Sequence, residues 1–253
     1  MRIAGLFLFC TMVAVSACQS QVEDKIVLIN VEDYDKIKIS KLISSINMLN
    51  PKVISLDIAL PEYTGDLSDK MLYQALLNTK KLILPSEISS EGLDYHGNEV
   101  ISVYLTFALE FFVPRAKTGF VSVKVDKGQT QIPRQFIVWQ KGSYSEDIYN
   151  HFSVVTAMAF DSLKASKFIR THERMVDINY KKGNRKFRVF SASEVLKGKL
   201  SVKDIKGKII MMGFLGPGDQ DKFSVAFNSS SNKTDIYGLE YLAIILAQVL
   251  ENQ

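Results

Sequence analysis

Short, almost wholly apolar segments alternate with helical patterns over the first third of this 253-residue chain, and this alternation limits its fold most strongly. Residues 25–31 (KIVLINV), 53–60 (VISLDIAL) and 81–85 (KLILP) are rich in branched aliphatic side chains, which predicts three strands. Strands that lack an alternating polar face are usually covered on both sides, as in parallel sheets. We therefore predict a parallel sheet with helices on its faces.

The segments between these strands have the spacing of amphipathic helices. Apolar residues recur every three or four positions over residues 35–49, and Asn50-Pro51 ends this pattern. A second helix is predicted over residues 66–80, with Asp66 or Ser68 as its N-cap. A β-α-β-α-β order is typical of an α/β layer with right-handed crossovers.

The middle of the chain follows a different pattern. We expect an irregular segment over residues 86–102, and a β-hairpin whose strands are residues 119–125 and 131–139. Apolar spacing over residues 145–162 predicts another helix, and the polar residues 223–236 predict a loop.

The last third returns to the first pattern. Residues 191–198 begin like a capping box, residues 208–214 (KIIMMGF) predict a buried strand, and residues 239–250 predict an amphipathic helix. The whole predicts one α/β domain over residues 25–253. Its architecture is a layered sandwich with a central mixed, mostly parallel sheet, flanked by helices and carrying an inserted β-hairpin.

The N-terminal residues have the pattern of an export signal. Arg2 precedes an apolar stretch that is too short for a membrane span of about 20 residues. Residues 15–18 (VSAC) resemble the bacterial lipobox, so we expect residues 1–17 to be removed, Cys18 to be lipidated and residues 18–24 to form a tether. The expected location is extracytoplasmic, on the periplasmic face or at the outer membrane. An ordinary signal peptide and an uncleaved anchor helix are the alternatives.

Composition excludes several classes of function. The net charge of +4 is spread along the chain, which argues against a nucleic-acid partner. The two cysteines both lie within the first 18 residues, so the body has no disulfide framework and no cysteine-ligated zinc site. The three histidines have no metal-ligand spacing, and no cofactor is predicted.

Candidate site residues gather where two predicted strands end. Asp57 lies in one apolar strand, and the other is followed by Gly213, Gly216, Asp219 and Asp221. Ligands of open α/β sheets bind beyond the carboxyl ends of the strands. These carboxylates could hold a hard cation such as Mg²⁺ or Ca²⁺, or they could cap turns and accept bonds from backbone amides. A nucleotide-binding loop is disfavoured, because no Lys-Ser/Thr follows the glycines.

The ordered motifs of the last third resemble those of the CHASE type 2 domain, an extracytoplasmic sensory module of bacterial receptors. They are Ile178-Asn179-Tyr180, the Ser191–Gly198 helix start, Gly207–Ile210, Gly213 with Asp219 and Asp221, and a closing helix with Gly238, Glu240 and Ala243. Weaker similarity lies around Asp57 and in Gly119, Asp126, Gly128 and Arg134, so the resemblance spans roughly residues 24–251.

The resemblance implies a sensory or ligand-binding domain rather than an enzyme. Members of that family usually continue into membrane helices and an output domain, whereas this sequence ends at Gln253. We therefore expect an unknown small ligand, attachment to the membrane through the lipid anchor, and a separate membrane-embedded signalling partner. The alternatives are a metal-assisted hydrolase that uses Asp57, Asp219 and Asp221, and a structural envelope protein.

Overall fold

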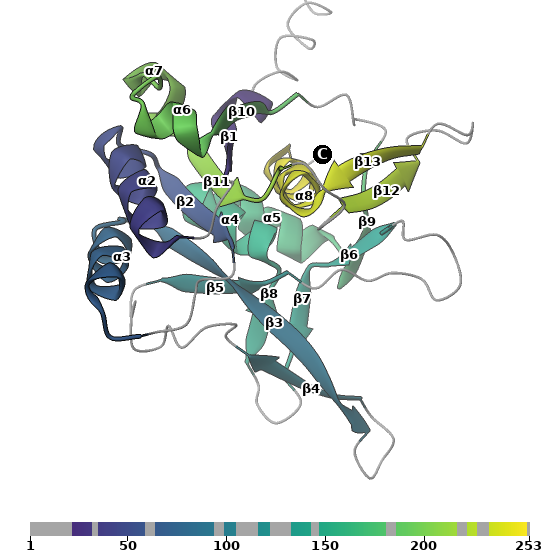
Figure 1. The fold of residues 1–253 in the computed structure, drawn as a ribbon. Coiled ribbons are helices and arrows are strands. Elements are labelled where there is room, and N and C mark those ends of the chain that lie inside the picture. Colours follow the sequence, from purple (N-terminus) through teal and green to yellow (C-terminus); the bar gives the residue numbers. More distant parts are fainter. Residues whose placement is uncertain are drawn as a thin grey trace, which may run out of the picture.

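The computed structural model forms a layered α/β sandwich (Figure 1). It describes residues 22–31, 35–58, 64–93, 99–104, 116–121, 133–142, 147–180, 186–216, 222–226 and 233–251. Statements about structure below refer to these ranges.

Six parallel strands make the central sheet, in the spatial order β10-β1-β11-β2-β3-β5. In that order they are Arg188–Ser191, Ile26–Asn30, Ile209–Gly213, Val53–Asp57, Leu82–Leu93 and Lys117–Phe120. The outer part of the long strand β3 also pairs antiparallel with β4 (Glu99–Tyr104). The sheet is therefore mixed and mostly parallel, as predicted.

Successive residues of the central strands enter two different cores. In β1, Ile26 and Leu28 belong to one hydrophobic cluster, whereas Val27 and Ile29 belong to the other. All four side chains are fully buried. This explains why the strands lack a polar face: both sides of the sheet are covered, and either face needs apolar side chains.

One face of the sheet is covered by the crossover helices of the parallel strands. These are α2 (Lys36–Met48), α3 (Leu67–Leu77) and the short helices α6 (Ala192–Leu196) and α7 (Val202–Ile205). Asp35, Asp66 and Ser191 cap α2, α3 and α6 with their side chains, as the sequence predicted for the last two.

The other face is covered by α4 (Phe152–Phe160), α5 (Ser162–Thr171) and α8 (Gly238–Glu251). Figure 1 shows α8 in yellow beside α4 and α5, on the side of the sheet away from α2 and α3. Gly119 of β5 allows this layer to approach closely, because a Cβ there would lie 2.6 Å from the Cα of Phe152.

Short antiparallel pairs complete the structure. β6 (Gln135–Ile137) pairs with β9 (Met175–Asp177), and β7 (Trp139–Lys141) pairs with β8 (Ile148–Asn150). A third pair joins β12 (Lys222–Ala226) to β13 (Lys233–Tyr237), and one 3-10 turn, Glu23–Lys25, precedes β1.

The inserted hairpin was predicted at the wrong residues. It is formed by β3 and β4, over the segment expected to be irregular. Residues 117–120 instead join the parallel sheet as β5, and residues 135–137 pair with β9 rather than with residues 119–125. Pairing partners far along the chain leave no local signal, which is why the turn-like residues 126–128 misled the prediction; these residues lie outside the described ranges.

Two further predictions were wrong. Residues 145–162 do not form one helix: Ile148 lies in β8, and the helical part begins after His151 and breaks at Asp161, which caps α5. Residues 223–236 are not only a loop, because they contain most of β12 and β13. Polar residues conceal this hairpin from a search for apolar runs.

Candidate functional site

Three neighbouring strands of the sheet end side by side. In the parallel register, Asn30 of β1 lies opposite Gly213 of β11, and Gly213 lies opposite Asp57 of β2. The order across the sheet is therefore Asn30, Gly213, Asp57. We call this row of three residues the strand-end row. It lies at the carboxyl edge, where parallel α/β sheets bind ligands.

Gly213 leaves no room for a side chain at the centre of this row. A Cβ at this position would lie 3.0 Å from Cδ1 of Leu239 and 3.1 Å from the carbonyl oxygen of Asp57. Leu239 belongs to the first turn of α8. The glycine thus lets the start of α8 pack directly onto the ends of β11 and β2.

Hydrogen bonds from β1 and from Tyr237 hold residues 214–216, which follow β11. The backbone N–H of Leu215 donates to Oδ1 of Asn30 at 2.8 Å. The hydroxyl of Tyr237 donates to the carbonyl oxygen of Gly216, and the ring of Tyr237 meets that of Phe214 edge-on. These contacts fix the path of residues 214–216 between β1 and the start of α8.

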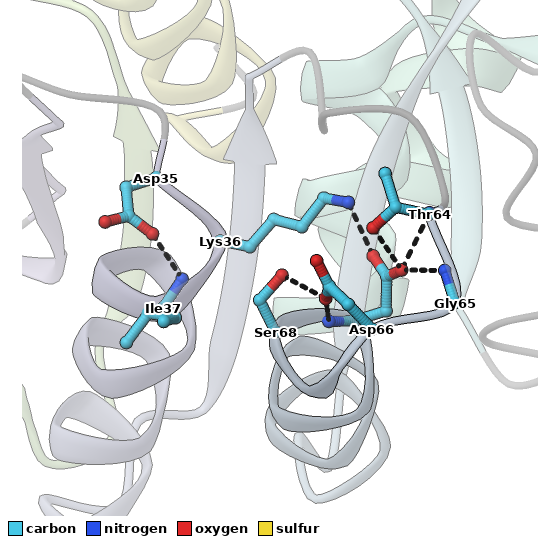
Figure 2. Close-up of polar contacts among 8 residues, drawn as sticks. Asp35, Lys36, Ile37, Thr64, Gly65, Asp66 and Ser68 are labelled. Carbon is cyan, nitrogen blue, oxygen red and sulfur yellow. Dashed lines mark hydrogen bonds and ion pairs between the residues drawn. The ribbon is translucent and has the colours of Figure 1, made fainter.

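The helices that begin at this edge are capped by their own residues (Figure 2). Oδ1 of Asp35 accepts from the N–H of Ile37 at 2.8 Å, and Oδ1 of Asp66 accepts from the N–H of Asp69 at 3.1 Å and from the hydroxyl of Ser68. The hydrogen bond from Ser68 and the one from the Asp69 amide lower the pKa of Asp66. These carboxylates are therefore used to hold helices.

A buried ion pair joins the starts of α2 and α3. Nζ of Lys36 lies 2.6 Å from Oδ1 of Asp69, and both side chains are buried. The other carboxylate oxygen accepts from the backbone N–H groups of Thr64 and Gly65 at 2.8 and 2.7 Å (Figure 2). Burial alone would raise the pKa of Asp69, but the bonds from Lys36, Thr64 and Gly65 outweigh it and hold this pKa well below its usual value.

The ion pair fixes the segment that follows Asp57. Thr64 and Gly65 end the connection between β2 and α3, so Asp69 ties this connection to its own helix and, through Lys36, to α2. Sequence reasoning missed Lys36 and Asp69. A lysine at the start of one helix and an aspartate in the first turn of the next give no motif until the two helices are placed side by side.

His151 caps the helix that begins beyond the end of β5. Its Nδ1 accepts from the N–H of Ser153 at 3.2 Å, and its ring is fully buried against Phe120 and Phe136. Burial lowers the pKa of His151 to about 3, so the ring is neutral at ordinary pH. His151 is therefore a helix cap within the core.

The structure brings together only part of the predicted site. Asp57 and Gly213 are neighbours, as expected for parallel strands, and Gly216 follows in the adjoining loop. Asp219, Asp221 and Cys18 lie outside the described ranges. Within those ranges, no group of three or more His, Cys, Asp and Glu side chains could hold a metal ion. Ligand binding at Asp57, Gly213 and Gly216 stays a prediction.

Comparison with known proteins places the chain in a family. The model of the CHASE2 domain matches residues 19–253, whereas no curated protein and no solved structure matches. CHASE2 domains are extracytoplasmic sensory domains and are generally not enzymes. No helix in the described ranges is both long and apolar enough to cross a membrane. The ordered motifs and the match over almost the whole sequence lead to one conclusion: this chain belongs to the CHASE2 domain family.

Proposed function

We propose that this protein is a lipid-anchored sensory domain that recognises a small ligand outside the cytoplasm and acts through a separate membrane-embedded partner. The observation that carries the proposal is the family match over residues 19–253. The lipobox-like residues 15–18 support cleavage before Cys18. The tether predicted over residues 18–24 is shorter than expected, because Val22 is buried in the core and Glu23–Lys25 form a 3-10 turn ahead of β1.

The strand-end row is the proposed place of recognition. Asp57 supplies a carboxylate beside Gly213, and Gly216, Asp219 and Asp221 are the further contacts expected from the sequence. Ligand binding would shift residues 57–66 and 213–224, and this shift would have to rearrange the hydrogen bonds that hold Thr64, Gly65 and Gly216. Such a shift transmits no more free energy than the difference between the ligand's affinities for the two states. The partner must therefore contact these segments or the helices beside them.

Labelling with a palmitate analogue tests the anchor. The full chain, expressed in a bacterial host, should incorporate the label and fractionate with membranes, and Cys18→Ser should abolish both. Cys10→Ser is the matched control, because it removes the other cysteine and leaves the lipobox intact. Equal labelling of the Cys18→Ser variant would contradict the proposed anchor.

A thermal-shift screen against small anions, sugars and divalent cations tests recognition. Under the proposal, a ligand raises the melting temperature without being consumed, and Asp57→Asn reduces the increase. Glu173→Gln, an exposed carboxylate change far along the chain, should leave the increase unchanged. Metal-dependent turnover that is lost in Asp57→Asn would instead favour the hydrolase alternative.

Crosslinking in intact cells tests the partner. A photoreactive residue at position 64, in the connection that follows β2, should capture a membrane protein, whereas the same residue at position 149 in β8 should not. Equal capture at both positions would argue against a specific contact at the carboxyl edge.

A further inference from the structure

Lysines mark the edge of the central sheet at which the parallel strands begin, opposite the strand-end row. We call it the amino edge. Each of the six parallel strands has a lysine as its first residue or within the two positions before it. In the spatial order β10-β1-β11-β2-β3-β5, these lysines are Lys186, Lys25, Lys208, Lys52, Lys81 and Lys117.

The strand register places part of this set in one row. The first residues of β1, β11 and β2 lie side by side in the parallel pairing. The residues directly before them therefore come next to one another: Lys25, Lys208 and Lys52. Neighbouring strands are only about 4.8 Å apart, so positive charge is concentrated along this edge.

Part of the charge is used inside the fold, and part of it faces solvent. The ammonium groups of Lys52 and Lys81 contact the end of α4. By contrast, Lys25, Lys186 and Lys206 are exposed, and no ion pair joins them to another residue in the described ranges. These three exposed lysines can therefore interact with a partner outside the fold.

Carboxylates at this edge are few. Glu23 and Asp24 lie in the 3-10 turn before β1, Asp161 caps α5, and Glu251 ends α8. Among the described residues, no Asp or Glu lies within three positions before any of the other five parallel strands. The starts of the strands are therefore mainly positive.

The chain enters the sheet at the same edge. Val22 is buried in the core, and the 3-10 turn that follows it leads directly into β1. Cys18, the proposed site of lipidation, precedes Val22 by only four residues. Four residues span at most about 14 Å even when fully extended. An anchor at Cys18 therefore holds the amino edge close to the bilayer.

A positively charged edge held beside a bilayer is complementary to anionic headgroups. We propose that the amino edge docks on the surface of a membrane that contains anionic phospholipids, with Lys25, Lys186 and Lys206 against the headgroups. This inference rests on the proposed anchor at Cys18, and it adds an orientation and a lipid preference to it.

The orientation has a consequence for recognition. Strands rise about 3.3 Å per residue, so the strand-end row lies about 13 Å further from the bilayer than the start of β1. The proposed ligand site then points away from the lipid. A membrane-embedded partner must therefore extend beyond the bilayer surface to reach it.

Fluorescence quenching in reconstituted vesicles tests the orientation. The lipidated chain, purified from bacterial membranes, carries a dye on one introduced cysteine, because cleavage removes Cys10 and lipidation blocks Cys18. Asn78→Cys places the dye at the end of α3, at the amino edge, and Leu67→Cys places it at the start of the same helix. Both positions are exposed, and neither substitution changes the charge.

A quencher attached to the lipid headgroups should reduce the fluorescence at position 78 more than at position 67 when the vesicles contain phosphatidylglycerol. The difference should shrink in vesicles of phosphatidylcholine alone and at high salt, because salt screens the attraction. Equal quenching at the two positions, or a difference that does not depend on phosphatidylglycerol, would overturn the proposal.

Charge variants test the role of the three exposed lysines. A lysine close to an anionic surface favours the docked state by about fivefold at low salt. The triple variant Lys25→Gln, Lys186→Gln and Lys206→Gln should therefore return the quenching at position 78 to its level in phosphatidylcholine vesicles. Circular dichroism checks that the variant is folded.

The matched control makes the same charge change at exposed lysines nearer the opposite edge. It combines Lys41→Gln in α2, Lys70→Gln in the first turn of α3 and Lys197→Gln after α6. This triple variant should keep the quenching at position 78. Equal effects of the two triple variants would overturn the assignment to the amino edge.

Flotation in a density gradient separates failure of the docking from failure of the anchor. Under the proposed function, the lipidated wild type floats with vesicles of phosphatidylcholine alone. A protein that floats but shows no quenching dependent on phosphatidylglycerol would overturn only the docking. A protein that does not float would overturn the anchor as well.

Discussion

The two edges of the central sheet both carry polar side chains, but they use them differently. At the carboxyl edge, Asn30, Gly213 and Asp57 end three adjacent strands, and a cavity of about 340 Å³ lies beside them. At the amino edge, asparagines and lysines surround a hollow of only about 80 Å³. Among the described residues, the larger of these two hollows lies at the carboxyl edge.

The polar groups of the amino edge join the layers. Nζ of Lys81 donates to the carbonyl oxygen of Ala159 at 2.7 Å, near the end of α4. The Lys52 ammonium lies 4.5 Å from the ring centre of Phe160. Lysines are favourable at helix ends, where carbonyl groups lack partners. Helix α4 thus has a buried histidine, His151, at its start and the ammonium group of Lys81 near its end.

The largest expected effect is a loss of folding stability at acidic pH. His151 has a folded pKa of about 3, below its ordinary value of 6.5, so the unfolded chain binds the extra proton first. The stability that this difference provides is complete above pH 6.5 and decreases as the pH falls towards 3. Between pH 7 and 4.5 the free energy of unfolding should fall by about 2–3 kcal/mol from this group.

Urea unfolding across this pH range measures the effect. His151→Asn keeps a capping side chain and should flatten the slope, although the smaller side chain lowers stability overall. An unchanged slope in His151→Asn would mean that another group causes the acid sensitivity.

The next largest effect is the loss of stability when a glycine at each edge is replaced by alanine. Gly213→Ala must displace Leu239 or the end of β2 and should cost about 2 kcal/mol. Gly207, before β11, has open space but a φ of 71°, so Gly207→Ala should cost about 1 kcal/mol through backbone strain alone. Thermal and urea unfolding of both variants test this order. A smaller loss in Gly213→Ala would show that the carboxyl edge is looser than described.

The smallest expected loss of stability comes from removing lysine ammonium groups at the amino edge. Lys81→Met keeps the aliphatic stem and removes the bond to Ala159, which should cost about 1 kcal/mol. Lys80→Met is the matched control, because the Lys80 ammonium lies 3.5 Å from the Asn50 side chain at an exposed position, and it should cost less than about 0.5 kcal/mol. Neither variant should change the thermal shift that a ligand of the carboxyl edge causes. A change in that shift would break the distinction between the edges.

The sequence predicted the elements whose signals are local. The structure confirms the strands predicted within residues 25–31 and 53–60, the helices that follow them and the capping box at Ser191. These elements were predictable because a strand covered on both faces and a capped helix each depend on residues that are close together in the sequence. The adjacency of Asp57 and Gly213 was also predictable, since parallel strands align their carboxyl ends.

The remaining features depend on contacts between distant segments. The pairing of residues 135–137 with 175–177 has no local signature, and neither does the ion pair between Lys36 and Asp69. The cavity has the same origin, because α2 and α6 are separated by more than 140 residues and become neighbours only when β10 pairs with β1.

Hydrogen exchange of the full chain, with and without the ligand that gives the largest thermal shift, tests most directly the claim that recognition occurs at the carboxyl edge. We predict slower exchange in peptides that cover residues 28–31, 55–58 and 211–216, with no change over residues 47–53 and 78–82. Protection confined to the amino-edge peptides, or no protection anywhere at a saturating concentration of that ligand, would contradict this claim.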